Sequence, residues 1–316
     1  MFFHLGLIGY PLGHSLSPKI HAAALESCGL RGDYSLFPIA PDDQQGLRDL
    51  LARVRSGAIH GLNVTIPHKQ NVISLLDELT PTAQAIGAVN TIYRRGDKLI
   101  GENTDAAGFL SDVKKFLADS PFGLQRSAVT TYPKRNHYAK KLAKIRANSR
   151  LREALCGSGR QLRSALILGA GGSARAVVYA LVRDGWEVTI AARRLEQAQE
   201  LASHDARAVY ALRITHDELS SLPAVALVVN ATPVGMAPNI HHSPWPANLP
   251  FPPHAAVYDL VYNPSETQLV KDARAAGLPA TTGLGMLVEQ AALSFERWTG
   301  RRPERSILWL IANTAH

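Results

Sequence analysis

Cysteine is scarce in this chain, and its scarcity excludes two ways of stabilising a small protein. The 316 residues include two cysteines, Cys28 and Cys156. Two isolated thiols make neither a disulfide framework nor a cysteine-bound metal cluster, and they favour a reducing compartment. The one adjacent histidine pair, His241-His242, has no cysteine or acidic residue nearby. A surface loop is therefore the better interpretation of that pair, and no metal is expected.

Long apolar runs are absent as well. No run of about 18 apolar residues occurs, so a membrane-spanning helix is not expected. The first six residues lack the basic segment that opens a signal peptide, and Pro11 follows soon after, so a first strand is predicted instead. An apolar content of 46% and a charged content of 19% are typical of a globular protein, and the length allows two domains with their own cores.

Positive charge is in excess, and the excess is concentrated in one segment of the chain. Of the net charge of +8, residues 126–163 contribute eleven Lys or Arg against one acid, a net +10 that leaves −2 for the remainder. The basic character of the chain therefore comes from one segment, and it is weak support for nucleic-acid binding by the fold as a whole. Tyr132, His137 and Tyr138 lie among these charges and can stack on bases, but a solvated insertion is the favoured interpretation.

Strand and helix patterns alternate along the first hundred residues. Ser17 is expected to be the N-cap of a helix with Pro18 at its first position, and a hairpin is predicted around Arg95-Gly96-Asp97. We expect strands at 3–9, 34–39, 59–66, 89–94 and 98–101, and helices at 42–54, 80–86 and from 105 to about 117.

A second block with the same rhythm begins at Ala165. Strands are expected at 165–168, 187–191, 224–229 and 256–260, and helices at 173–183, 196–203, 284–298 and 305–312. This βαβ alternation is typical of a doubly wound nucleotide-binding domain, so the predicted fold class is α/β. The connection at 118–163 is unusually long and shows only a weak helical pattern, over 138–155.

The stretch Asn63-Val64-Thr65-Ile66-Pro67-His68-Lys69 is predicted to end a buried strand. Its apolar residues can face a core while Asn63 and Thr65 face the other way, and Pro67 cannot continue a central strand. Polar groups would then stand at the edge of a sheet, where open α/β folds bind ligands. Taken by itself, the stretch also fits an ordinary loop with a solvated lysine.

A glycine turn follows the strand predicted at 165–168. The residues Gly169-Ala170-Gly171-Gly172-Ser173-Ala174 stand between that strand and a predicted helix. The first glycine permits a tight turn, the second lets backbone N–H groups approach a pyrophosphate, and alanine is accepted in place of the third. We therefore predict a dinucleotide site in preference to a purely structural turn.

The end of the next predicted strand favours NADP(H) over NAD(H). An NAD site carries an acid here to bind the ribose 2′-hydroxyl, whereas this chain has Ala192-Arg193-Arg194. Two guanidinium groups suit a 2′-phosphate, and cations are otherwise disfavoured at the start of a helix. A pair of solvated arginines is the alternative.

A hydride carrier needs a proton carrier beside it. Lys69 and Asp105 each follow a predicted strand end, and brought together they can shuttle a proton and orient a hydroxyl. Taken alone, Asp105 also fits a plain helix cap.

The motifs taken together resemble the shikimate dehydrogenase family over nearly the whole chain except about 118–163. The matching stretches keep the family's order along the chain. They are Ser15-Leu16-Ser17, 63–69, Ala88-Val89-Asn90-Thr91, Asn103-Thr104-Asp105, the glycine turn, 230–236, 259–264 and 283–290. The resemblance implies an enzyme, an NADP-dependent oxidoreductase acting on a CH–OH group, which reversibly reduces 3-dehydroshikimate to shikimate in aromatic amino-acid biosynthesis.

The resemblance also implies roles for individual residues. Ser15 and Ser17 would bind the substrate carboxylate with help from Tyr262, and Lys69 would be the acid/base with Asp105 as its partner. The ring hydroxyls and the carbonyl would be held by Asn63, Thr65, Asn90, Asp105 and Gln290. The cofactor contacts would be Gly169, Ala170, Gly171, Gly172, Ser173, Ala174, Arg193, Arg194, Thr232, Met236, Gly283 and Met286.

The architecture that the resemblance implies has two domains. An N-terminal α/β substrate domain would comprise residues 1–110 with 284–316, and a doubly wound Rossmann-type NADP-binding domain would comprise 111–283, including the basic insertion. Two departures from the family pattern stand in the second domain. Ala192-Arg193-Arg194 replaces a common Asn-Arg-Thr, which leaves the adenosine contacts less defined, and Pro233 stands where serine is common.

Alternatives from more than one class stay open. A quinate or dual-specificity dehydrogenase would share the motifs, although Ser17 favours shikimate because family members that prefer quinate often have threonine there. A non-catalytic NADP-binding regulator would be expected to lose Lys69 or Asp105, and an RNA-binding adaptor would act through the basic segment. The expected partners are the small-molecule substrate and NADP, with a homodimer left open, no membrane and nucleic acid disfavoured. The expected location is cytoplasmic.

Overall fold

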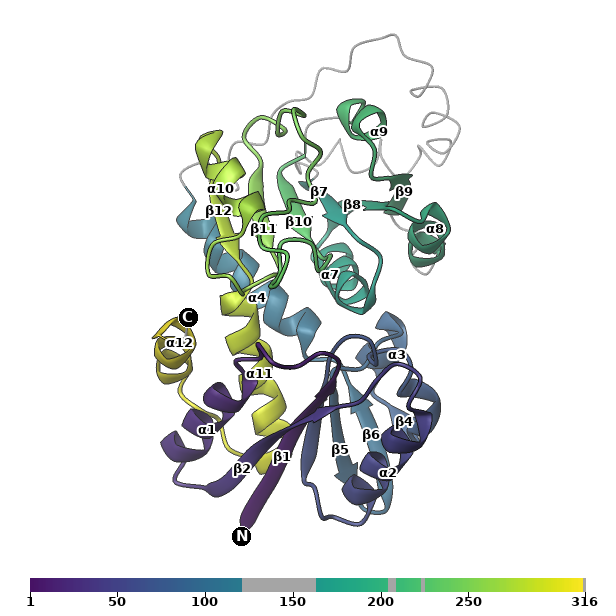
Figure 1. Ribbon diagram of the computed structural model, residues 1–316, viewed down its shortest axis with the longest axis vertical. Helices are drawn as coiled ribbons and strands as arrows, with labels where there is room; N and C mark the ends of the chain where they lie inside the picture. Colours follow the sequence, from purple (N-terminus) through teal and green to yellow (C-terminus); the bar gives the residue numbers. More distant parts are fainter. Residues whose placement is uncertain (121–162, 204–208, 223–224, 315–316) are drawn as a thin grey trace.

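The computed structural model describes residues 1–120, 163–203, 209–222 and 225–314. Most of the basic segment, the helical pattern predicted at 138–155 and Cys156 lie outside these residues. Figure 1 shows two sheets one above the other along the long axis, with helices α4 (Asp105–Asp119) and α11 (Leu284–Thr299) running between them. The α/β class predicted from the alternating patterns is confirmed.

The first sheet is mixed and has the strand order β2-β1-β3-β5-β6-β4. Strand β1 pairs in parallel with β2 and β3, whereas β5 runs antiparallel to both β3 and β6. The predicted hairpin around Gly96 is the connection between β5 and β6. The strand bounds are β1 Phe2–Gly9, β2 Arg31–Pro38, β3 Gly61–Val64, β4 Glu78–Leu79, β5 Thr91–Arg95 and β6 Lys98–Glu102.

The second sheet is parallel throughout and has the order β12-β11-β10-β7-β8-β9. Its two halves extend outward from β7 and β10, which is the doubly wound order in which ligands bind at the central switch point. The strand bounds are β7 Arg163–Leu168, β8 Trp186–Ala192, β9 Val209–Arg213, β10 Leu227–Asn230, β11 Ala256–Asp259 and β12 Ala280–Thr282.

Helices cover both faces of each sheet. Apolar side chains of α1, α11 and α12 form one core of the first sheet, and those of α2 form the other. In the second sheet, α4, α7 and α8 pack on one face and α10 on the other. The remaining bounds are α1 Ser17–Ser27, α2 Gln44–Arg55, α3 Pro81–Ile86, α7 Gly172–Arg183, α8 Leu195–Ser203, α9 His216–Ser220, α10 Gln268–Ala275 and α12 Arg305–Thr314.

Helices α4 and α11 pack closely because a glycine lies at their contact. A Cβ atom added to Gly108 of α4 would lie 2.8 Å from the backbone nitrogen of Gln290 on α11. The absence of a side chain therefore lets the two backbones approach. This contact brings the first residue of α4, Asp105, to the same region as Gln290.

Several local predictions needed correction. Helix α1 begins at Ser17 itself, with Leu16 as the N-cap and no side-chain cap, so Ser17 does not cap the helix. The strand predicted at 59–66 is shorter, since β3 ends at Val64 before Pro67. The predictions missed β4, β9, α9, α10, β12 and a short 3-10 helix at Ile73–Leu75.

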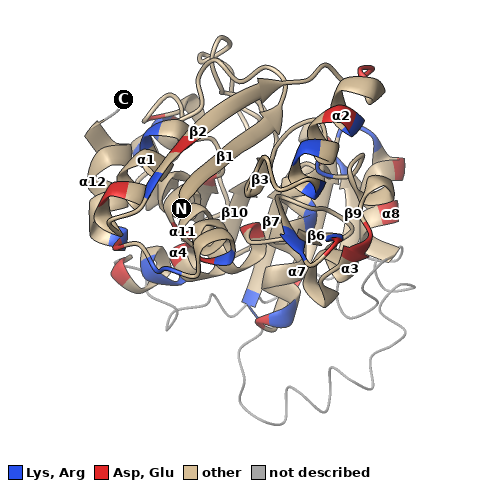
Figure 2. Cartoon of the chain, turned by 90° about the horizontal axis from the view of Figure 1, so that it is seen from below, with Lys and Arg blue, Asp and Glu red and all other residues tan. Residues whose placement is uncertain are grey.

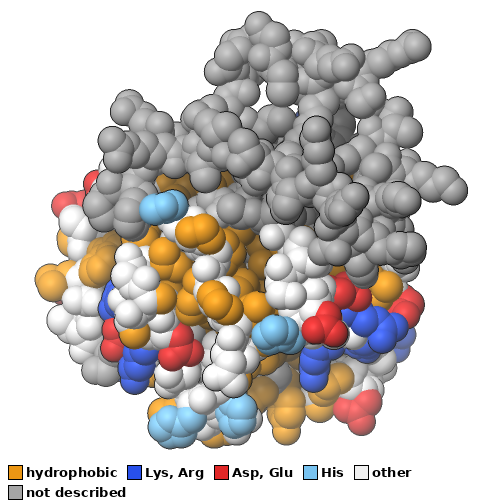
Figure 3. Space-filling model, turned by 90° about the horizontal axis from the view of Figure 1, so that it is seen from above, with side chains coloured by type: hydrophobic (Ala, Val, Ile, Leu, Met, Phe, Trp, Pro, Cys, Tyr) orange, Lys and Arg blue, Asp and Glu red, His pale blue; other side chains and the backbone are white. Residues whose placement is uncertain are grey.

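The described surface carries both signs of charge. Figure 2 shows Lys and Arg interspersed with Asp and Glu on the helices around the first sheet, and Figure 3 shows charged and histidine side chains among apolar ones at the opposite end. His241 and His242 are exposed. None of the described helices combines the length and the apolar character that crossing a membrane would require.

A buried histidine beneath the first sheet makes stability depend on pH. The His21 ring stacks on Tyr34 at 4.3 Å between ring centres, and burial lowers the pKa of His21 from its ordinary 6.5 to about 3, although the neighbouring Asn63 opposes the shift. The folded state thus disfavours protonation of the His21 ring. The stability contributed by the neutral ring is fully present above pH 6.5 and is lost as the pH falls toward 3.

We expect His21→Phe to flatten the dependence of the free energy of unfolding on pH. One pKa unit corresponds to about 1.4 kcal/mol, so a shift of this size is worth at most about 5 kcal/mol across the full window. The measurement is the urea midpoint from pH 4.5 to 7.5, with the exposed His216→Gln as the matched control. An acid slope in His21→Phe as steep as in the unaltered protein would contradict the assignment.

Candidate active site

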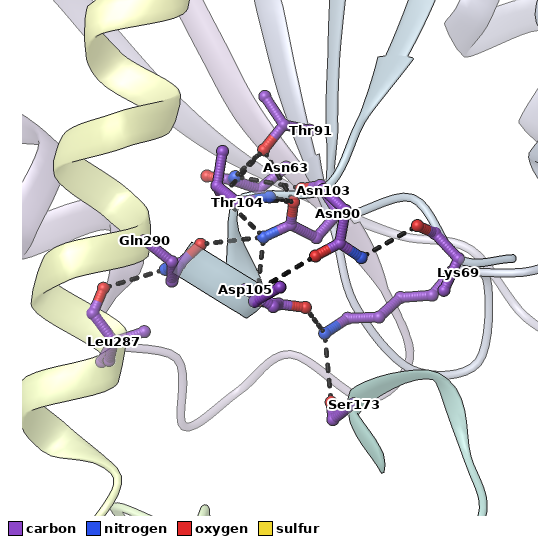
Figure 4. A network of polar contacts seen from close by, with 12 residues as sticks. Asn63, Lys69, Asn90, Thr91, Asn103, Thr104, Asp105, Ser173, Leu287 and Gln290 are labelled. Carbon is purple, nitrogen blue, oxygen red and sulfur yellow. Dashed lines mark hydrogen bonds and ion pairs between the residues drawn. The ribbon is translucent and has the colours of Figure 1, made fainter. Parts of the chain in front are cut away.

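A lysine and an aspartate from two strand ends meet in the interior. Lys69 Nζ lies 2.6 Å from Asp105 Oδ2, and the two residues are only 8% and 4% exposed. Figure 4 shows the Lys69 side chain reaching across to Asp105 at the start of α4. A buried ion pair of this kind is retained only when its members are matched and hydrogen-bonded. The pair that sequence analysis singled out is therefore brought together by the fold.

The backbone around Lys69 is held from several sides. The Lys69 carbonyl accepts a hydrogen bond from the Val89 N–H at 2.7 Å, and the neighbouring His68 ring contacts the Ile39 carbonyl, with Nε2 and the oxygen 2.7 Å apart. Thr65, half-buried, donates its N–H to the Ile8 carbonyl at 2.8 Å. These bonds fix the turn that follows β3, so the lysine side chain starts from a defined position.

Asn90 is the centre of a buried polar network. Its Nδ2 donates toward Asp105 Oδ1 at 2.9 Å and toward Gln290 Oε1 at 3.2 Å. Its Oδ1 accepts from the Thr104 N–H at 2.7 Å. The amide orientation is thereby determined, and the carboxylate of Asp105 is held by Asn90 on one oxygen and Lys69 on the other (Figure 4).

Asn63 extends this network toward β2. Its Nδ2 donates to the Asn90 carbonyl at 3.1 Å and to Ser294 Oγ at 3.0 Å, and its Oδ1 accepts from the Tyr34 hydroxyl at 2.8 Å. Sequence analysis missed Tyr34 and Ser294. Tyr34 looks like any strand aromatic, and Ser294 like one polar position of a helix, so no local pattern could have indicated them.

Ser15 and Ser17 lie beside two tyrosine hydroxyls. Burial raises the pKa of Tyr262, while the Ser15 side chain opposes that shift, and burial likewise raises the pKa of Tyr34 well above its usual range, with Ser17 opposing. The Ser17 N–H donates to Ser15 Oγ at 3.2 Å. Four neutral hydroxyl groups therefore gather near the start of α1, and neutral donors of this kind suit a carboxylate.

The glycine turn has the shape that a pyrophosphate requires. Gly169 has a φ of +110°, which side chains rarely tolerate, and Gly171 is the N-cap of α7 with open space around the position of a Cβ. The first N–H groups of a helix have no partner within it. An anion can therefore approach these groups, and the residues fit a dinucleotide phosphate.

Arg193 and Arg194 stand at the same edge of the second sheet. They follow β8, which pairs with β7, and the Gly169 N–H donates to the Ala191 carbonyl at 2.7 Å. Both arginines are exposed. Two exposed guanidinium groups at this edge of the sheet suit a phosphate.

The loop after β10 lies against the glycine turn. A Cβ added to Gly169 would be 3.0 Å from Thr232 Cγ2, and the Thr232 hydroxyl donates to Asn230 Oδ1 at 2.7 Å. Asn230 Nδ2 in turn donates to Asp259 Oδ1 at 2.8 Å, and burial raises the pKa of Asp259 to about 6. Met236, farther along this loop, is 40% exposed.

The start of α11 completes the arrangement. Gly283 is its N-cap and Met286 lies buried in its first turn. Gln290 follows one turn later, and its Nε2 donates to the Leu287 carbonyl at 2.9 Å (Figure 4). One helix thus carries residues predicted for the cofactor and a residue predicted for the substrate.

Comparison with known proteins identifies the family. Residues 7–92 match the Shikimate dehydrogenase substrate binding domain, and residues 283–308 match the Shikimate 5′-dehydrogenase C-terminal domain. A protein of Salinibacter ruber named shikimate dehydrogenase (NADP(+)) is 39% identical over 302 residues, which cover 93% of this chain and 91% of that protein. The chain belongs to the shikimate dehydrogenase family.

Solved structures similar to this shikimate dehydrogenase family member include both shikimate and quinate dehydrogenases. The Thermus thermophilus shikimate 5-dehydrogenase, in complex with NADP(H) and shikimate, has a TM-score of 0.74 at 36% identity, covering 99% of this chain and 100% of that one. A Corynebacterium glutamicum quinate dehydrogenase in complex with NAD has a TM-score of 0.76 at 29% identity, covering 99% of both chains. The fold is therefore shared by shikimate and quinate dehydrogenases and does not separate them.

Proposed function

We propose that this chain is an NADP-dependent shikimate dehydrogenase. It reversibly reduces 3-dehydroshikimate to shikimate in the biosynthesis of chorismate and the aromatic amino acids. The observation that carries the proposal is the buried Lys69–Asp105 pair, 2.6 Å apart, in a member of this family whose glycine turn lies directly beside the lysine.

The substrate is oriented from three sides. The hydroxyls of Ser15, Ser17 and Tyr262 bind its carboxylate. The amide and carboxylate groups of the buried network hold the ring hydroxyls and the carbonyl, and their members are Asn63, Thr65, Asn90, Asp105 and Gln290. Because these groups are polar and largely buried, a ligand that lacks a hydroxyl leaves one of them unpaired and binds less well.

Lys69 carries the proton. In the reducing direction its ammonium donates a proton to the carbonyl oxygen as the carbonyl carbon receives hydride, and in the oxidising direction the neutral amine takes the proton back. Asp105 keeps the lysine in place through the 2.6 Å contact. The bound dinucleotide supplies or accepts the hydride, and the protein contributes position and the proton.

The cofactor is held at the edge of the second sheet. The glycine turn, Gly169 to Ala174, would hold the pyrophosphate, and Arg193 and Arg194 would hold the 2′-phosphate. Thr232, Met236, Gly283 and Met286 would supply the remaining cofactor contacts. The position of Gly171 as the N-cap of α7 and the exposure of both arginines support this assignment.

The domain assignment stays a proposal with the boundaries predicted from the sequence. Residues 1–110 with 284–316 form the substrate domain, and 111–283 form the dinucleotide-binding domain. The packing of α11 and α12 on α1 supports the return of the last residues to the first domain. A homodimer and a cytoplasmic location stay predictions.

The activity is tested by following NADPH absorbance with NADP⁺ and either shikimate, quinate or no substrate. We expect kcat/KM for shikimate to exceed that for quinate by about tenfold or more, because quinate adds a hydroxyl beside the carboxylate clamp. Equal or faster oxidation of quinate would favour the alternative function, that of a quinate dehydrogenase. No reduction of NADP⁺ with either compound would contradict both.

A further inference from the structure

The cofactor turn touches the proton-carrying lysine directly. Lys69 Nζ lies 3.2 Å from Ser173 Oγ, in the first turn of α7, in addition to its contact with Asp105 (Figure 4). A Cβ added to Gly172 would lie 3.1 Å from the Lys69 Cβ and 3.3 Å from its Cδ. The backbone of α7 therefore packs against the lysine stem while the serine hydroxyl meets its tip.

These contacts restrict an otherwise flexible side chain. A lysine loses up to about 2 kcal/mol of rotamer freedom when it is fixed, so it holds one position only where several groups define it. An ammonium has three N–H donors. Asp105 and Ser173 accept two of them, and the direction of the third is then determined by tetrahedral geometry.

A hydroxyl suits this place because it works with both forms of the lysine. It accepts a hydrogen bond from the ammonium, and it can rotate to donate one to the neutral amine. A carboxylate can only accept, so Asp105 can pair with an N–H of either form but cannot donate to the lone pair of the neutral amine. Ser173 is therefore able to keep its contact through the whole reaction cycle.

We propose that Ser173 is a positioning residue that aims the Lys69 N–H at the reacting oxygen and ties the lysine to the cofactor helix. This inference rests on the proposed function and extends it, since the serine was predicted only as a cofactor contact. Its action passes through Lys69, so its removal impairs proton transfer rather than substrate binding.

The test compares Ser173→Ala, Ser173→Thr and Ser203→Ala, the last of which removes a hydroxyl that donates to the Glu200 carbonyl in its own helix. A hydrogen bond to a charged group commonly changes rates by about tenfold, so we expect Ser173→Ala to lower kcat by about that factor with the KM for shikimate nearly unchanged. Its solvent deuterium isotope effect should rise. Ser173→Thr restores kcat because the hydroxyl returns, and Ser203→Ala matches the unaltered enzyme.

A second readout needs no activity. Without ligands, Ser173→Ala should lower Tm in the unaltered protein but not in Lys69→Met, because the two residues are coupled only while the ammonium is present. An equal loss of Tm in both backgrounds, or a rise in the KM for NADP⁺ with kcat unchanged, would overturn the proposal. If no variant or parent turns over shikimate, the proposed function fails, and the Tm comparison still decides the Ser173–Lys69 coupling.

Discussion

Replacing Lys69 by alanine is expected to lower kcat for shikimate oxidation by about 1,000-fold, within the range that a positioned acid/base contributes. The substrate clamp and the cofactor turn remain in that variant, so the KM values for shikimate and NADP⁺ should change much less than kcat. Steady-state kinetics measured by NADPH absorbance provide the check. Turnover within about tenfold of the parent enzyme would remove Lys69 from the chemistry.

Two controls separate chemistry from stability in this experiment. Lys98→Ala removes another lysine that is paired with an acid, Glu78, but that pair lies at the surface. The kcat of this variant should therefore equal that of the parent enzyme. Removing one member of a buried pair costs about 3–5 kcal/mol of stability because the other charge is left unpaired. The double variant Lys69→Met with Asp105→Asn leaves no unpaired buried charge, so it should fold well and still fail to oxidise shikimate.

The second large effect concerns the choice of cofactor. Replacing both Arg193 and Arg194 by alanine should lower kcat/KM for NADPH by at least about 100-fold, since each of the two charge-assisted bonds to phosphate is worth about 1.5–3 kcal/mol. The value for NADH should change less than about threefold, because NADH has no 2′-phosphate and loses no such bond. The reduction of 3-dehydroshikimate with each cofactor gives both numbers.

The matched control for that variant is Arg183→Ala. Arg183 is an exposed arginine of the same half of the chain, and its guanidinium lies over the Tyr179 ring at 5.3 Å instead of beside the glycine turn. Its cofactor preference should equal that of the parent. A parent enzyme that uses NADH as well as NADPH would show that the two arginines do not select the phosphate.

The parts of the fold with a strong local signal could be predicted from the sequence. The glycine turn after an apolar strand, the stop before Pro67, and the face of α2 formed by Leu47, Leu50 and Val54 all follow from rules that act within a few residues. The short elements could not be predicted in this way, because strands such as β4 and β12 contain two or three residues and show no period.

The candidate site shows the same division. Lys69, Asp105 and the glycine turn stand at strand ends, where the sequence itself indicates a ligand-binding edge. Ser294 and Tyr34 contact Asn63 from α11 and β2, at sequence separations of 231 and 29 residues. Contacts between residues so far apart in the sequence depend on how the helices and strands pack, so no local sequence pattern predicts them.

Helix α11 fixes the distance between a predicted cofactor contact and a predicted substrate contact. Met286 and Gln290, which we assign to the cofactor and to the substrate, are four positions apart and so lie on one face of the same helix. One residue inserted between them would rotate every later side chain by about 100° and shift it by about 1.5 Å along the axis. Loops elsewhere in the chain can change length without disturbing this register, whereas the spacing within α11 cannot.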